Sequence, residues 1–368
     1  MGAGPKGIAI AAKARALAAA GLPAPRVVLV DRSEVAGNWT GRQGYTSGLL
    51  PLGTPPEKDV GYPYAASWDD ASADVVGAMA QYSWQRHLIR HGVYSDWVDR
   101  GRLRPTHREW STYLREVAEL AEAEIVRGVV TGLEITGGDR WEVTLEAGSA
   151  MTADGVVMTG AGPAITVPGQ PRDHPRVLDG RTYRLAAHKL ARERAVNVCV
   201  VGSGETAASV VIDLLKRCGR HSTIDVLATR GVLYSRGESY DENQFYSDPS
   251  DWPHLAEAHR REFLERTDRG VFSLQAEATL NQARGSRAAR CTSRPTGPTA
   301  VSDASPVYTP IRTRTRSPAG HAWPSSACCI ATVAARHARG EANAAKNPSP
   351  SVFSSRPSCA ARTDRISA

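Results

Sequence analysis

VNVCVVGSGETAASVVIDLLKRC, residues 196–218, decides the fold because it places a strand, a glycine turn and a helix in immediate succession. The apolar, mostly β-branched run Val196–Val201 predicts a buried strand. Gly202 and Gly204 supply a tight turn, and Glu205–Arg217 has the apolar spacing of a helix. This order is typical of the nucleotide-binding half of a doubly wound α/β fold.

A second strand is predicted at Thr223–Ala228, so the helix would connect two parallel strands. Folds of this kind that bind NAD carry an acidic residue after that strand, whereas this chain has Thr229 and Arg230. Because a cation there accommodates a 2′-phosphate, we expect NADPH as the ligand, with Arg230 as a contact. The alternative is a βαβ unit that binds no nucleotide.

The opening residues MGAGPKG repeat this pattern, with Gly2, Gly4 and Gly7 in the spacing G-x-G-x-x-G. The Ala-rich segment Ile8–Ala20 predicts a short helix directly after the turn. No strand precedes the turn, which a late start in the reading of the gene would explain. The sequence therefore predicts a second dinucleotide site, and the alternative is a glycine-rich tail before an ordinary helix.

Arg26–Asp31 is predicted as a parallel strand that ends in an acid. Asp31 lies 24 residues after Gly7, about where such folds place the carboxylate that meets a ribose hydroxyl. Farther along, Trp141–Leu145 and Gly155–Met158 predict two strands that connect the two nucleotide folds. Two dinucleotide folds joined in this way indicate a flavoprotein that takes hydride from a pyridine nucleotide, with FAD at the first site.

Residues 281–368 differ from the rest of the chain in composition. The segment has no leucine and is dominated by Pro, Ser, Thr, Ala and Arg. Because so few large aliphatic residues cannot bury enough surface to offset conformational entropy, we expect it to be disordered. The abrupt change resembles a shift of reading frame in a GC-rich gene, and a genuine disordered extension is the alternative.

The charge follows the same division. The chain carries a net charge of +7, but residues 281–368 hold 12 Arg and one Lys against three acidic residues. The first 280 residues are therefore mildly acidic, which does not favour a nucleic-acid partner. No apolar run approaches the length of a membrane span, and we expect Cys199 and Cys218 to be reduced thiols of a cytoplasmic protein.

The sequence as a whole predicts an α/β protein with two Rossmann-like domains. The FAD-binding domain would span residues 1–165, the NADPH-binding domain 166–280, and the tail 281–368. A helix within LAEAHRREFLERT, residues 255–267, is expected to carry a substrate loop.

Residues 1–280 lack the Cys-x-x-Cys of disulfide reductases, and VPGQPRDHPRV at 167–177 only approaches the F-x-G-x-x-x-H pattern of ketone-oxidising flavin monooxygenases. The chain instead resembles the flavin-dependent N-hydroxylating monooxygenases that act on lysine or ornithine in siderophore assembly, especially the lysine N6-hydroxylases of mycobactin-type pathways. The resemblance covers about residues 1–280, and four segments carry it: GNWTGRQGYTSGLLPLGTPPEKDVGYPY (37–64), MAQYSWQRHLIRHGVYSDWVDRGRLRPTHREWSTYLREVA (79–118), RGESYDENQFYSDPSDWPHL (236–255) and ERTDRGVFS (265–273).

The resemblance implies roles for individual side chains. Trp39 and the pair Lys58-Asp59 would flank the isoalloxazine, and Lys58 would contact both the nicotinamide and the substrate amine. Asn243 and Asp268 would bind the backbone end of the amino acid. From the residues alone, Lys58 could be a solvated surface lysine, Asn243 could cap a loop, and Asp268 could pair with a neighbouring arginine, Arg266 or Arg269.

Glu205 and Thr206 stand where the related ornithine enzymes carry a Gln-Ser pair that touches the nucleotide. The resemblance further implies FAD and NADPH as cofactors, L-lysine and molecular oxygen as substrates, and hydroxylation of N6 through a C4a-hydroperoxyflavin. The family's C-terminal part has no counterpart in residues 281–368. A non-catalytic remnant that binds NADPH but holds FAD poorly, an ornithine N5-hydroxylase and another NADPH-oxidising flavoprotein are the alternatives.

The histidines give no indication of a metal. His87, His91 and His107 have no Cys or acidic partner at metal-binding spacing, so the sequence predicts no metal site. The sequence is compatible with a homo-oligomer.

Overall fold

A computed structural model describes residues 2–43, 46–64, 71–160, 174, 176–190, 192, 196–218, 222–228, 232–268, 270–286, 290–293, 309–314 and 327–331. All of these residues belong to one compact unit, Met1–Ala335, and the second unit, Arg336–Ala368, lies outside the described residues. In the described part of the chain, no helix is both long enough and apolar enough to cross a membrane.

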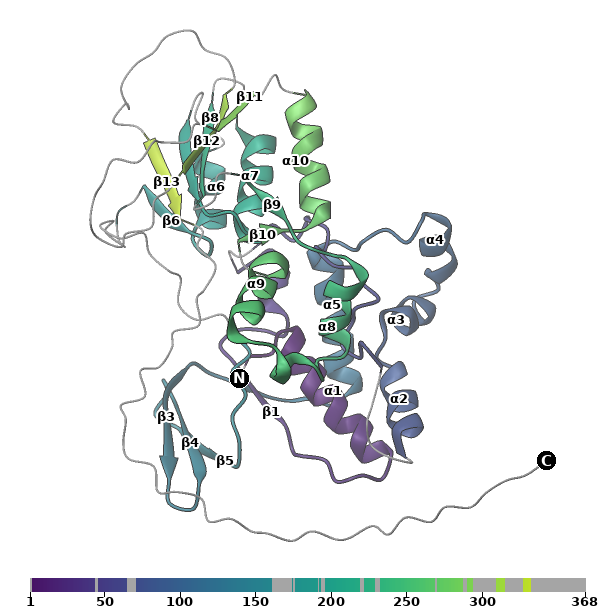
Figure 1. Cartoon of the computed structure of the whole chain (residues 1–368). Coiled ribbons are helices and arrows are strands. Elements are labelled where there is room, and N and C mark those ends of the chain that lie inside the picture. Colours follow the sequence, from purple (N-terminus) through teal and green to yellow (C-terminus); the bar gives the residue numbers. More distant parts are fainter. Residues whose placement is uncertain are drawn as a thin grey trace, which may run out of the picture. The chain divides into compact units, whose positions relative to one another are not determined.

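The fold is mixed α/β (Figure 1). The helices are α1 (Pro5–Ala19), α2 (Ser72–Ala80), α3 (Trp84–Arg90), α4 (Tyr94–Asp99), α5 (His107–Leu120), α6 (Tyr183–Leu190), α7 (Glu205–Arg217), α8 (Tyr240–Ser247), α9 (Glu257–Thr267) and α10 (Leu274–Ser286), with 3-10 turns η1 (Gly37–Trp39) and η3 (Trp252–His254). The strands are β1 (Val28–Asp31), β2 (Glu124–Arg127), β3 (Val130–Thr136), β4 (Arg140–Leu145), β5 (Ala150–Ala153), β6 (Val177–Asp179), β7 (Asn197–Val201), β8 (Thr223–Ala228), β9 (Tyr234–Ser235), β10 (Val271–Phe272), β11 (Arg290–Ser293), β12 (Thr309–Arg314) and β13 (Ala327–Ala331).

The largest sheet has six strands in the order β11-β12-β8-β7-β13-β6. β7 and β8 pair in parallel and α7 connects them, so the strand, turn, helix and strand predicted around residues 196–228 are all present. Apolar side chains of α7 pack against β7 and β8 because the helix buries one face; they are Ala207, Ala208, Val210, Val211, Ile212 and Leu214. The predicted bounds of α7 and β8 are those of the structure.

Three strands of this sheet come from residues 281–368, the segment that composition predicts to be disordered. β12 pairs antiparallel with β8, and β13 lies between β7 and β6. Beyond the end of α10, these three short strands are the parts of that segment that the structure describes. The end of α10 at Ser286 passes the expected boundary at residue 280.

The amino-terminal part forms around α1, which begins directly after Gly4, in agreement with the predicted turn and helix. A Cβ added at Gly7 would lie 2.0 Å from the backbone oxygen of Gly2, so only glycine permits this packing of turn against helix. β1 follows as predicted and pairs in parallel with β2, a strand that the sequence did not indicate. A cluster of buried side chains from α1, α3 and α5 supports this part.

A three-stranded antiparallel sheet, β3-β4-β5, lies between the two nucleotide-fold patterns in the chain. β4 matches the strand predicted at 141–145, but residues 155–158, predicted as the next strand, form no strand. Pairing of β5 with β4 ends at the partners Trp141 and Ala153. Val157 and Met158 are exposed.

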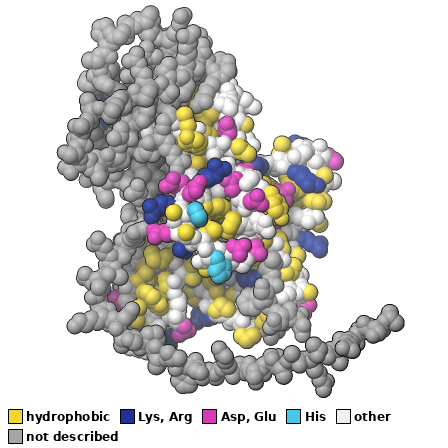
Figure 2. All heavy atoms as spheres, viewed as in Figure 1, with side chains coloured by type: hydrophobic (Ala, Val, Ile, Leu, Met, Phe, Trp, Pro, Cys, Tyr) yellow, Lys and Arg dark blue, Asp and Glu magenta, His cyan; other side chains and the backbone are white. Residues whose placement is uncertain are grey.

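Charged side chains of both signs cover the face shown in Figure 2, where acidic and basic groups are interspersed over α8 and α9. Among the described residues of this face, the basic groups do not gather into a single patch. This agrees with the mildly acidic composition of the first 280 residues.

A buried carboxylate joins α6 to α7. Asp213 accepts a hydrogen bond of 2.8 Å from the Tyr183 hydroxyl and forms ion pairs with Arg184 at 2.8 Å and Arg217 at 2.7 Å. The Arg184 side chain is 6% exposed, whereas that of Arg217 is 39% exposed. The Arg184 cation therefore depends on Asp213 for its charge compensation.

We expect Asp213→Ala to lower the free energy of unfolding by about 3 kcal/mol, because it leaves the buried Arg184 charge unpaired. Arg217→Ala is the matched control and should cost less than about 1 kcal/mol, since that arginine is partly solvated. Urea unfolding of both variants measures the difference. Equal losses in the two variants would contradict the assignment of Asp213 as the partner of a buried cation.

Candidate active site

Both glycine turns have the geometry of an anion-binding helix terminus. Gly4 and Gly204 are the N-caps of α1 and α7. Because glycine has no side chain, no side-chain hydrogen bond caps the first N–H groups of either helix. A Cβ added at Gly4 would meet no atom within 4 Å, and one at Gly204 would meet its nearest atom only at 3.8 Å. Gly202 has a φ of +130°, which a residue with a side chain rarely adopts. Open space beside the N–H groups of a helix start suits a diphosphate.

Asp31 lies next to the first turn, at the end of β1 as predicted. Its Oδ2 accepts a hydrogen bond of 2.9 Å from the Ala3 amide, and its Oδ1 accepts one of 2.9 Å from the Ser33 amide. The carboxylate therefore holds the glycine turn against the strand end. Its predicted contact with a ribose stays a prediction.

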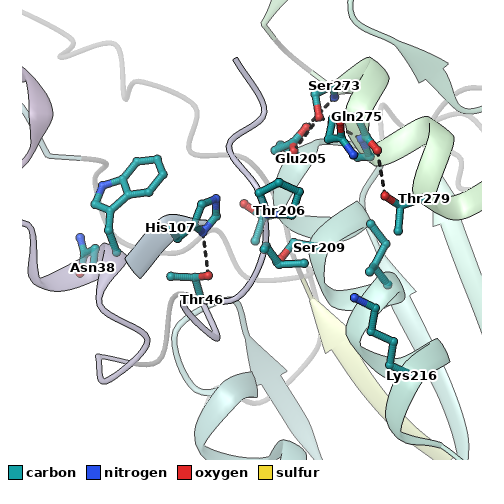
Figure 3. Close-up of a pocket in the computed structure, with 15 residues that line it drawn as sticks. Asn38, Thr46, His107, Glu205, Thr206, Ser209, Lys216, Ser273, Gln275 and Thr279 are labelled. Carbon is teal, nitrogen blue, oxygen red and sulfur yellow. Dashed lines mark hydrogen bonds between the residues drawn. The ribbon is translucent and has the colours of Figure 1, made fainter. Parts of the chain in front are cut away.

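A cavity of about 330 Å³ lies between the amino-terminal segment and the α7–α10 helix pair (Figure 3). Figure 3 shows Asn38, Thr46 and His107 on one side and Glu205, Thr206 and Lys216 on the other. The lining residues are Asn38, Trp39, Thr46, Leu50, Pro51, His107, Glu205, Thr206, Ser209, Ile212, Lys216, Ser273, Gln275, Ala276 and Thr279. The structure thus brings Trp39, expected on the flavin side, to the same cavity as Glu205 and Thr206, expected on the nucleotide side.

Glu205 is held in place by Ser273 at the wall of this cavity. The Ser273 amide donates to Oε2 at 2.6 Å and its hydroxyl donates to Oε1 at 3.0 Å. Because these bonds occupy both carboxylate oxygens, Glu205 connects the start of α7 to the start of α10. Ser273 lies in one of the segments that carry the resemblance, but its sequence context gives no indication of this contact.

Lys58 and Asn243, predicted as substrate contacts, meet in the structure although 185 residues separate them. The Lys58 Nζ donates a hydrogen bond to the Asn243 Oδ1. The Asn243 Nδ2 donates in turn to the backbone oxygens of Glu238 at 2.9 Å and Ser239 at 3.0 Å, which fixes the amide orientation. Lys58 also lies 5.6 Å from the ring centre of Tyr62. These contacts hold Lys58 at a defined position, which does not favour a fully solvated surface lysine.

Asp59 anchors the loop that carries Lys58. Its carboxylate accepts hydrogen bonds from the Gly61 amide at 3.0 Å, the Tyr64 hydroxyl at 2.7 Å and the Trp84 amide at 2.8 Å. Burial raises the pKa of Asp59 above its ordinary value, although these hydrogen bonds act in the opposite direction. The Trp84 bond attaches the loop to the first turn of α3.

Asp268, the third predicted substrate contact, is exposed at the C-terminal end of α9. Arg266, one of the partners considered for it, forms its ion pair with Glu242 at 2.7 Å, and Arg269 lies outside the described residues. Among the residues that the structure describes, Asp268 makes no hydrogen bond to Lys58 or Asn243. Arg230, predicted to contact the 2′-phosphate, also lies outside them.

His107 is a cavity residue that the sequence did not single out for this role. Its ring lies 4.8 Å from the Trp39 ring, edge to face, and its Nδ1 lies 2.7 Å from the Thr46 Oγ1. The Thr46 oxygen also accepts from the Gly48 amide at 3.1 Å, and the tautomer of the His107 ring sets which of Thr46 and His107 donates to the other. Burial, assisted by the Arg184 charge, lowers the pKa of His107 to about 4.

The absence of a metal site stays a prediction, but the structure shows a histidine contact that the sequence spacing does not indicate. His87 and His91 lack an acidic partner nearby in sequence, but α5 brings Glu116 to within hydrogen-bonding distance of both imidazoles. Three residues with metal-binding side chains therefore meet at one point.

Comparisons with known proteins find a matching family model and similar proteins. The family described as L-lysine 6-monooxygenase/L-ornithine 5-monooxygenase matches residues 73–282. The L-lysine N6-monooxygenase MbtG of Mycobacterium sp. (strain MCS) is 42% identical over 285 residues, which are 76% of this chain and 64% of the relative. This chain therefore spans 64% of the length of that relative.

Solved structures give the same result. The structure of lysine monooxygenase NbtG from Nocardia farcinica matches with a TM-score of 0.64 and 37% identity, over 76% of this chain and 68% of that chain. The ornithine N-hydroxylase of Kutzneria sp. 744 matches with a TM-score of 0.60 and 15% identity, over 90% of this chain and 78% of that chain. At that identity the second match shows the fold alone.

His107 should make stability depend on pH. The pKa of His107 is about 4 in the folded chain, against 6.5 for an ordinary histidine. Between these two pH values the unfolded chain therefore binds a proton at this residue that the folded chain does not bind. The contribution of neutral His107 to the free energy of unfolding is therefore complete above pH 6.5, and it is lost as the pH falls towards 4. We expect the parent chain to lose about 2 kcal/mol more than His107→Gln between about pH 7 and about pH 5 in urea unfolding. An equal pH dependence in the two proteins would contradict the lowered pKa of His107.

Proposed function

The chain belongs to the L-lysine 6-monooxygenase/L-ornithine 5-monooxygenase family, and from this premise we propose that it is an FAD- and NADPH-dependent monooxygenase that hydroxylates N6 of L-lysine for siderophore biosynthesis. The observation that carries the proposal is the hydrogen bond from Lys58 to Asn243. It joins the flavin-side loop to the segment expected to bind the amino acid. The relatives that support lysine over ornithine are the lysine monooxygenases at 37% and 42% identity.

Two Rossmann-like domains would hold the cofactors. The turn at Gly2, Gly4 and Gly7 would bind the diphosphate of FAD, and the turn at Gly202 and Gly204 that of NADPH. The open space beside both helix starts is the feature that supports this assignment. When bound, NADPH supplies the hydride and the flavin supplies the oxygen chemistry, which no side chain of the protein can perform.

The cavity supplies the site where the two cofactors would approach each other. Trp39 and His107 would lie on the flavin side, and Glu205 and Thr206 on the nucleotide side. Its apolar walls, such as Leu50, would limit access of water to the reacting atoms. Arg230 remains our predicted contact for the 2′-phosphate.

Lys58 would control the protonation of the substrate. A free lysine amine has a pKa of about 10.4 and must lose a proton before it can act as a nucleophile. The Lys58 cation near the substrate would favour the neutral amine, and Asn243 would hold Lys58 in position. Asp268 at the end of α9 is proposed to bind the backbone end of the amino acid. The reaction needs NADPH and free lysine, and we therefore propose a cytoplasmic location.

Purified full-length chain tests the function. We expect it to bind FAD, to oxidise NADPH, and to convert lysine into N6-hydroxylysine, as detected by mass spectrometry. Conversion of ornithine in place of lysine would favour the ornithine N5-hydroxylase. NADPH oxidation that yields only peroxide would favour another flavoprotein, and failure to bind FAD would overturn the proposal in favour of a remnant that binds NADPH.

Lys58→Ala should lower the hydroxylated product formed per NADPH oxidised by about tenfold or more, because the amine loses its positioning cation. Asn243→Ala should lower it less, since Lys58 remains but is free to move. Lys189→Ala on α6 is the matched control, because that lysine is exposed, and it should leave the ratio unchanged. If Lys58→Ala formed as much product per NADPH oxidised as the parent, Lys58 would not be part of the active site.

A further inference from the structure

Outside the proposed active site, two histidines and a carboxylate meet between α3 and α5. His87 Nδ1 lies 2.6 Å and His91 Nε2 lies 2.7 Å from the same atom, Oε2 of Glu116. The three ligand atoms all lie within 4.8 Å of one another. His87 and His91 occupy positions i and i+4 of one helix and its C-cap, which places both imidazoles on one side of α3.

The directions of the two imidazoles favour a shared ligand. Each ring nitrogen points to the same oxygen, so the in-plane lone pairs of the deprotonated atoms would converge on one point. Zn²⁺ binds histidine nitrogen and carboxylate oxygen at about 2.0–2.2 Å, which separates neighbouring ligand atoms by about 3.3 Å in a tetrahedral site. To admit an ion, the Glu116 oxygen must withdraw from both nitrogens, and the two nitrogens, which lie within 4.8 Å of each other, must take up a separation of about 3.3 Å.

The surroundings satisfy the other requirements of such a site. The other carboxylate oxygen of Glu116 accepts a hydrogen bond of 2.5 Å from Arg90, which also donates to the Gln81 oxygen. Arg90 therefore orients the carboxylate and leaves Oε2 directed at the histidines, as partners of ligating carboxylates do. The His87 side chain is 9% exposed and that of His91 is 54% exposed, so one side is closed and the other is open to an entering ion.

We propose that His87, His91 and Glu116 form a binding site for one divalent transition-metal ion, with Zn²⁺ the ion that suits this donor set. Without the ion, the same groups form a hydrogen-bonded cluster that includes the Arg90 ion pair. The ion would displace the protons of His87 Nδ1 and His91 Nε2 and join α3 firmly to α5. Because the first residue of α3, Trp84, holds Asp59, the ion would also steady the loop that carries Lys58.

Isothermal titration of Zn²⁺ into chelator-treated full-length chain tests the site. We expect saturable binding of one ion per chain and a higher melting temperature with Zn²⁺ present. His91→Gln should weaken the affinity at least about tenfold. The substitution is at an exposed side chain and should leave the fold intact. His188→Gln, an exposed histidine on α6, is the matched control and should bind Zn²⁺ as the parent does.

Two outcomes would overturn the site: absence of saturable binding to the parent chain, or equal Zn²⁺ affinity in the parent and His91→Gln. The titration uses no flavin, nucleotide or amino acid. Its result is therefore independent of the proposed oxygenase activity.

Discussion

The partly buried carboxylate of Asp59 is the contact on which the candidate active site depends. It holds one loop through bonds from Gly61 and Tyr64, and it attaches that loop to α3 through the Trp84 amide. Burial is unfavourable for the charged form, as the raised pKa of Asp59 indicates, and three hydrogen bonds offset only part of that cost. Lys58 precedes Asp59 directly, so the anchor limits where its side chain can reach.

Besides the bond from Lys58 to Asn243, the same loop contacts the segment before α8 through a backbone oxygen. The Gly53 carbonyl accepts hydrogen bonds from Arg104 at 2.7 Å and from Arg236 at 2.9 Å. Arg104 precedes α5, whereas Arg236 lies shortly before α8. Glu205 lies beside the same glycine, since a Cβ added at Gly53 would come within 3.1 Å of Glu205 Oε1. Segments distant in sequence are thus joined by two arginine side chains that donate to one backbone oxygen.

Helices and strands that depend on a local sequence pattern can be predicted from the sequence. Strands that depend on pairing with a distant segment cannot. The bounds of α7 and β8 follow from apolar periodicity and a glycine turn, and the structure agrees. β2 and β13 have no such signal, because each depends on a partner strand elsewhere in the chain. Lys58 and Asn243 were singled out by family resemblance, not by spacing. The contact of Glu116 with His87 spans 29 residues and two helices, so no spacing rule could indicate it.

The chemical nature of the partner of Lys58 bears on what the site can do. An amide at position 243 accepts a hydrogen bond from the Lys58 ammonium without cancelling its charge. A carboxylate there would form an ion pair, and the field that disfavours a protonated substrate amine would be largely lost. His107, in contrast, is held neutral by burial, so it does not add a second positive charge beside Trp39. Positive charge is thereby kept at Lys58, where the proposed chemistry requires it.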